Sequence, residues 1–269
     1  MVAPARLVDR IAVPLRKGGG VLAVLLVASL AGCGDNGNTP SSPPGDTTLQ
    51  MPFAVGDRWE YREVTTVSTG LGADTTLSVA TLVGTRLIDG APYYTQVDSS
   101  VAGTDTTYAR QTGSSLYLVV DLGDSSDPVA RAVLDILEAT LPWRLAEFGA
   151  PASSSWSLAS IDTVLVVEGS SYEMSFDIEA TSRGTEEVTV PAGSWSGAQR
   201  FLLHLHGTAG LQGSPLPSSQ TSDQDFWMVD GVGIVKRRSV DTFQSPTGSF
   251  TVDTVSDLTT YAVQRPLPE

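Results

Sequence analysis

The chain has 269 residues, of which 41% are hydrophobic and 17% are charged, and its formal net charge is −14 at pH 7. This length suffices for one substantial domain or at most two, and the hydrophobic fraction is too high for a disordered polymer. The acidic balance excludes nucleic acid as a partner, because contact with the phosphate backbone needs a basic face. The single cysteine excludes an intramolecular disulfide framework and a thiolate zinc cluster.

Residues 1–32 predict an export signal. Four basic residues precede the apolar run 21–30, which is too short to span a bilayer, and small residues follow it. The sequence Leu30-Ala31-Gly32-Cys33 resembles the lipobox of bacterial lipoproteins, in which the signal is cut before the cysteine and the thiol is joined to diacylglycerol. The resemblance implies a lipidated Cys33. The alternatives are an ordinary secretory signal with a chance cysteine, or a buried free thiol.

A lipidated Cys33 would make the protein membrane-anchored. Each buried methylene contributes roughly 0.8 kcal/mol, so two or three acyl chains hold stably where one holds only marginally. Removal of residues 1–32 leaves a charge of −17, so anionic head groups repel the mature chain and the lipid must carry the attachment. Segment 34–48 has no aliphatic or aromatic residue, which indicates a flexible tether with a reach of roughly 20 Å. We therefore expect a lipidated cysteine and tether over 33–48 and a single β-rich domain over 49–269.

From residue 49 onward the main signal is an alternation of apolar and polar residues. It is clearest over 172–179, where it has no exception and predicts a half-buried strand. Short connections such as Asp89-Gly90 favour hairpins between sequence neighbours. The prediction is a mainly all-β domain of about ten to twelve antiparallel strands, forming a strongly curved sheet or a partly open β-barrel. Looser runs of the same kind are 59–68, 75–88, 93–98, 104–110, 185–190, 198–208, 222–229, 233–243 and 249–263.

One apolar helix is predicted over 127–140. Asp127 is an N-cap acceptor and Pro128 suits the first helical position. Three polar residues starting at Arg131 fall in one narrow stripe, so most of the helix circumference is apolar and must be buried. We expect this helix to lie in the concave side of the sheet as a plug or lid, with the apolar contact continued by 141–148. A two-layer sandwich with a crossing helix is the alternative.

The runs 116–122 and 161–167 are apolar on both faces, and strands of this kind must be covered on both sides. The predicted helix is the expected cover. Space left beneath it would form a dry cavity for an apolar ligand. The residues expected to line this cavity are Val133, Met174, Phe176 and Leu116.

Three local patterns resemble those of a family of uncharacterised bacterial lipoproteins: the G-x-x-W-x-Y motif at 56–61, the VPAG hairpin at 190–193, and the G-x-G-I-V-K closing strand at 231–236. The architecture also looks, more distantly, like the half-barrel with a helical lid of lipoprotein-localisation carriers. That resemblance implies an acyl chain as ligand. From the residues alone the motifs have structural roles, because glycine and proline shape turns and aromatic residues at strand spacing belong to cores.

The histidines His204 and His206 are the candidate metal ligands. On a strand they share one face and could present two imidazoles to a metal, with a third ligand supplied by a neighbouring strand. A pair of polar residues on a solvated face is the simpler interpretation. In the basic cluster 236–238, alternation places Lys236 and Arg238 on one face and Arg237 on the other. These cations would form ion pairs with nearby carboxylates, or contact an acidic partner or a lipid phosphate.

No phosphate-binding loop or dinucleotide motif is present in the sequence, so we expect no cofactor and no enzymatic activity. The sequence predicts a lipid-anchored protein of the bacterial cell envelope, facing the periplasm or the cell surface. It would bind an apolar ligand or acyl chain, or act as a structural or protein-interaction module without a cavity, with an envelope protein as partner. A metal-dependent hydrolase using His204 and His206 is the third hypothesis.

Overall fold

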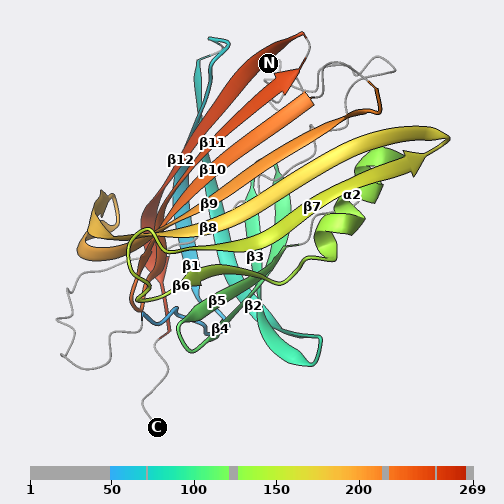
Figure 1. Cartoon of the computed structure of the whole chain (residues 1–269). Coiled ribbons are helices and arrows are strands. Elements are labelled where there is room, and N and C mark those ends of the chain that lie inside the picture. Colours follow the sequence, from blue (N-terminus) through green and yellow to red (C-terminus); the bar gives the residue numbers. More distant parts are fainter. Residues whose placement is uncertain (1–48, 71, 121–126, 214–217, 246, 265–269) are drawn as a thin grey trace.

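Alternating side chains and tight turns fold the chain into a meander of long antiparallel strands (Figure 1). The computed structural model describes residues 49–70, 72–120, 127–213, 218–245 and 247–264. The predicted signal, Cys33 and the tether lie outside these residues. Twelve strands form one sheet in the order β6-β5-β4-β3-β2-β1-β12-β11-β10-β9-β8-β7. The first and last strands of the chain therefore pair with each other. The two edge strands of the sheet are β6 and β7, which follow one another in the chain.

The strands are β1 (Arg58–Val67), β2 (Ala73–Ile88), β3 (Ala91–Ser100), β4 (Gly103–Thr112), β5 (Ser115–Val120), β6 (Trp143–Glu147), β7 (Ser155–Val167), β8 (Ser170–Val190), β9 (Gly193–Leu211), β10 (Ser218–Val229), β11 (Gly233–Ser245) and β12 (Gly248–Ala262). The helix α2 (Pro128–Glu138) lies between β5 and β6 in the chain.

The sheet curls into a nearly closed barrel whose seam lies between β6 and β7. At this seam the indole Nε1 of Trp156 on β7 donates a hydrogen bond to the carbonyl oxygen of Arg144 on β6, at 2.6 Å. The Arg144 guanidinium also lies over the Trp156 ring, 5.0 Å from its centre. Figure 1 shows the strands splaying apart toward one end, where α2 lies beside β7. This architecture confirms the predicted curved antiparallel sheet and excludes the sandwich.

The helix is built as its sequence predicts. The Asp127 carboxylate accepts a hydrogen bond from the backbone nitrogen of Val129 at 2.9 Å, which satisfies a free N–H of the first turn. One side of α2 is buried and carries Val129, Val133, Leu134 and Leu137, of which Val133 and Leu137 pack against strand residues. Among the described residues no helix has both the length and the hydropathy to cross a membrane, and α2 itself has only 11 residues.

The apolar residues around α2 form one of three hydrophobic clusters in the molecule, which we call the helix cluster. It joins the helix to the inner faces of β7, β8 and β9. Its buried members are Val120, Val133, Leu137, Trp143, Ala159, Met174, Phe176, Ile178, Leu205 and Ala209.

Three sequence predictions about the strands are corrected. β6 forms a strand where the sequence suggested only continued apolar contact. β8 is a single strand of 21 residues rather than two separate runs, because its pairing with β9 continues through two register shifts. The expected double coverage of 161–167 is wrong: Val164 is 49% exposed and Val166 is 70% exposed, because α2 covers only the inner face of this strand.

Candidate ligand site in the barrel lumen

The inner face of the barrel changes from apolar to polar between β9 and β10. On β9, Leu203 and Leu205 point inward, and cross-strand pairing places them opposite Gln224 and Ser222 of β10. On the other side of β9, Leu205 pairs with Ile178 of β8, which continues the apolar wall. Period-two geometry makes each wall continuous along its strand, so a molecule in the lumen would touch aliphatic side chains on one side and polar side chains on the other.

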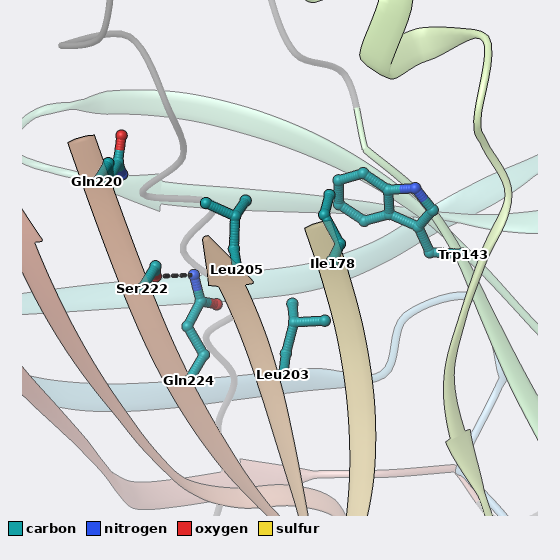
Figure 2. Close-up of a pocket in the computed structure, with 7 residues that line it drawn as sticks. All are labelled: Trp143, Ile178, Leu203, Leu205, Gln220, Ser222 and Gln224. Carbon is teal, nitrogen blue, oxygen red and sulfur yellow. Dashed lines mark hydrogen bonds between the residues drawn. The ribbon is translucent and has the colours of Figure 1, made fainter. Parts of the chain in front are cut away.

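A small pocket lies where the two walls meet, beside Trp143 (Figure 2). Its volume is about 10 Å³, roughly the space of one water molecule. Pockets for drug-sized ligands are much larger, at about 300–1,000 Å³, so the pocket as it stands is too small to hold an acyl chain. The lining residues are Trp143, Ile178, Leu203, Leu205, Gln220, Ser222 and Gln224.

The four residues predicted to line a cavity are packed side chains, and the pocket is lined by other residues. Val133, Met174 and Phe176 lie together in the helix cluster. Leu116 belongs to a neighbouring cluster, which also contains Phe201. The structure therefore brings three of the four together where the helix packs on the sheet and places the fourth elsewhere.

The pocket residue Trp143 is held in place by the C-terminal end of the helical segment. Its indole Nε1 donates a hydrogen bond to Oγ1 of Thr140 at 2.9 Å. The Thr140 hydroxyl in turn donates to the carbonyl oxygen of Leu137 at 2.7 Å. Displacement of α2 would therefore disturb Trp143, and its fluorescence can report on the lid.

The polar wall contains a chain of hydrogen bonds that ends at a buried carboxylate. Nε2 of Gln224 donates to the hydroxyl oxygen of Ser222 at 3.3 Å, as Figure 2 shows. Ser222 pairs across the strands with Asp241 of β11, whose side chain is 6% exposed. The Asp241 Oδ2 accepts a hydrogen bond from Ser239, whereas within the described part of the chain its Oδ1 accepts none.

Burial is the largest influence on Asp241 and raises the pKa of its carboxyl group. Hydrogen bonds from Ser222 and Ser239 lower the pKa, and the nearby charge of Asp223 raises it further, so the net direction is upward. A carboxylate loses its hydration when it is buried, and two hydroxyl donors compensate only part of that loss. The lumen thus contains an acceptor with unused capacity.

The lumen also contains a buried ion pair. Arg237 is 5% exposed, and its Nη2 donates to Oε1 of Glu63 at 3.1 Å and to Oγ of Ser256 at 3.2 Å. The neighbours Lys236 and Arg238 pair with Asp257 and Asp253 on the other face of the sheet. The sequence prediction that Arg237 faces away from its two basic neighbours is confirmed.

The two histidines lie on one exposed face of β9, as predicted from their spacing. Nδ1 of His204 is 2.6 Å from Oδ1 of Asp223, and Nδ1 of His206 is 3.3 Å from Oγ1 of Thr221. In the described ranges, no group of three or more His, Cys, Asp or Glu residues is arranged to hold a metal ion. The carboxylate next to His204 thus acts as a hydrogen-bond partner on the surface.

The three lipoprotein-like motifs meet in a second hydrophobic cluster, which supports their structural interpretation. The indole Nε1 of Trp59 donates to the carbonyl oxygen of Val232 at 2.6 Å, which joins the first motif to the third. The backbone nitrogen of Ala192 in the VPAG hairpin donates to the carbonyl oxygen of Leu258 on β12, at 3.0 Å. Trp59, Val232 and Leu258 are all buried in this cluster.

No protein-family model matches the chain, and no curated protein matches it. Two solved structures are similar to it. The first is an inferred exported protein with a YmcC-like fold from Bacteroides fragilis, with a TM-score of 0.38, 11% identity, and coverage of 80% of this chain and 99% of that one. The second is an inferred lipoprotein from Parabacteroides distasonis, with a TM-score of 0.39, 14% identity, and coverage of 81% and 100%.

Proposed function

We propose that this protein is a non-enzymatic lipoprotein of the bacterial cell envelope, anchored through acyl chains on Cys33. The support is the order of basic residues, apolar run and small residues before the only cysteine of the chain. A fatty-acid analogue fed to expressing cells should label the protein and should fail to label the Cys33→Ser variant. Equal labelling of the two proteins would contradict the anchor.

We further propose that the barrel body holds an apolar chain in its lumen after α2 moves away. The observation that carries this proposal is the packing of the helix: Val133 and Leu137 pack against an apolar wall that contains Phe176 and Ile178. The methylene groups of a ligand could make the same apolar contacts with this wall as the aliphatic side chains of the helix do. The polar stripe of α2 faces away, where Arg131 pairs with Glu138 at 3.4 Å.

Dodecan-1-ol is a suitable probe, used below the concentration at which it aggregates. We expect it to raise the melting temperature of the protein and to increase hydrogen exchange of the α2 amides, because the ligand takes the place of the helix. It should also change the fluorescence of the protein, and this change should be reduced in the Trp143→Phe variant.

Two variants locate the ligand. Leu203→Trp fills the pocket and should weaken dodecan-1-ol binding, whereas Val166→Trp adds the same side chain to an exposed position of β7, at 70% exposure, and should leave binding unchanged. If dodecan-1-ol neither stabilises the protein nor increases exchange in α2, the lumen does not act as a carrier. The barrel would then be a filled structural or interaction module, which is the alternative proposal.

A further inference from the structure

We propose that the lumen selects apolar chains whose head group donates a hydrogen bond and carries no negative charge, with Asp241 as the acceptor. This inference rests on the proposed function, because it concerns the head group of the chain that would replace α2. It narrows the apolar ligand or acyl chain expected from the sequence, since it excludes a free fatty acid, which carries a carboxylate.

The first support is the position of the polar wall. Ser222 and Gln224 line the pocket beside Leu203 and Leu205, and pairing across β9 and β10 places each polar side chain next to a leucine. A chain lying along the leucines would therefore bring its polar end to β10. Asp241 is the cross-strand neighbour of Ser222 on β11, one strand beyond the pocket lining.

The second support is the hydrogen-bond inventory of this wall. The amide Nε2 of Gln224 donates a hydrogen bond to Ser222, and the hydroxyls of Ser222 and Ser239 both donate to Asp241. The two serine hydroxyls and one of the two N–H groups of Gln224 are therefore occupied, whereas Oδ1 of Asp241 is buried without a hydrogen-bond partner in the described ranges. A carboxylate oxygen can only accept, and an unsatisfied buried acceptor is costly. A hydroxyl or ammonium head group would satisfy it.

The charges facing the lumen favour the same selection. The Arg237 guanidinium, which could attract an anion, is committed to Glu63 and Ser256. Asp241 has no comparable cation among the groups that shift its pKa, and the charge of Asp223, which lies beside His204 on the outer face of the sheet, raises that pKa further. A ligand carboxylate placed next to Asp241 would meet a like charge in a poorly hydrated site, where Coulomb repulsion is much stronger than in water.

The test compares three ligands with the same chain: dodecan-1-ol, dodecylamine and dodecanoate, at pH 8 and below their aggregation limits. We expect the alcohol and the amine to bind at least roughly tenfold more tightly than dodecanoate. In the Asp241→Asn variant the gap between alcohol and dodecanoate should shrink several-fold. The matched control is Asp253→Asn, which removes the same charge from the other face of the sheet, where Asp253 pairs with Arg238, and should keep the wild-type gap.

The outcomes separate the two proposals. If none of the three ligands binds, the proposed carrier function fails. If dodecanoate binds as tightly as the alcohol, the lumen holds chains but the head-group inference is overturned. An unchanged gap in Asp241→Asn, with a wild-type circular dichroism spectrum, would also overturn the role of Asp241. Should that variant not fold, the comparison of the three ligands on the wild-type protein decides the matter.

Discussion

The ring of Phe176 on β8 occupies the space in which a side chain of Gly207 on β9 would lie. The two residues are direct cross-strand partners, and an ideal Cβ on Gly207 would be 2.5 Å from Cε1 of Phe176. A glycine inside a strand often marks such a close approach. The apolar wall beneath α2 therefore depends on one missing side chain, and Phe176 can lie flat over β9 only because residue 207 is glycine.

Gly207→Ala should destabilise the protein by about 1–3 kcal/mol, because an added methyl group forces the packed ring out of its position. Gly197→Ala is the matched control in the same strand, since a Cβ there meets nothing within 4 Å. It should be neutral or slightly stabilising. Urea unfolding measures both changes. Phe176→Leu should make Gly207→Ala less costly, and strict additivity of the two substitutions would contradict the steric explanation.

Asp241→Asn should be more stable than the wild type at neutral pH, by roughly 1 kcal/mol, because the uncharged amide is less costly to bury than a carboxylate. Burial raises the pKa of Asp241 in the folded protein above its ordinary value of 3.8. Above the folded pKa the carboxylate is ionised in both states and destabilises the fold. As the pH falls through that pKa toward 3.8, the folded state takes up the proton first and the wild type gains stability.

The advantage of Asp241→Asn should therefore shrink as the pH is lowered and become constant below 3.8. Thermal unfolding of both proteins between pH 3.5 and 8 tests this. Asp253→Asn serves again as the control, because loss of the exposed pair with Arg238 should cost only about 0–1 kcal/mol. An advantage of Asp241→Asn that grows as the pH falls would refute the raised pKa.

Arg237→Met should destabilise the protein by about 3–5 kcal/mol, because it leaves the buried Glu63 carboxylate without its cation. Arg238→Met is the control at the next position and removes an exposed pair with Asp253, which should cost at most about 1 kcal/mol. In the double variant Glu63→Gln/Arg237→Met most of the loss should be recovered. Denaturant unfolding of the wild type and the three variants measures these changes. Equal losses of stability in Arg237→Met and Arg238→Met would show that the buried pair with Glu63 matters no more than an exposed one.

The sequence was sufficient to predict the elements whose signals are local. Strict alternation predicts the β8 strand, and an acceptor followed by proline predicts the start of α2 at Pro128. β6 was missed because Trp143–Glu147 is short and mostly apolar, so no alternation distinguishes it from a continued helix contact. The sequence wrongly predicts cover on both faces of 161–167, because the composition of this range does not reveal that the helix lies on one side only.

The polar wall could not be predicted for a different reason. Residues 218–225 of β10 are all polar, so alternation gives no indication of which face is buried. Only the pairing with Leu205 on one side and Asp241 on the other turns Ser222 toward the lumen. A candidate site that depends on register between strands is visible only in the folded molecule.

Leu137→Ala distinguishes a lid from an integral plug. Leu137 is fully buried in the helix cluster, and the loss of its side chain should weaken the seat of α2 by about 2–5 kcal/mol. If α2 opens independently of the barrel, hydrogen exchange of its amides should increase by roughly 30-fold or more, while central amides of β8 and β9 keep their protection. The control Asp135→Ala lies on the exposed stripe, at 56% side-chain exposure, and should change neither. Equal acceleration in the helix and the strands would mean that α2 unfolds only with the whole barrel, and the lumen could then not exchange its helix for a ligand.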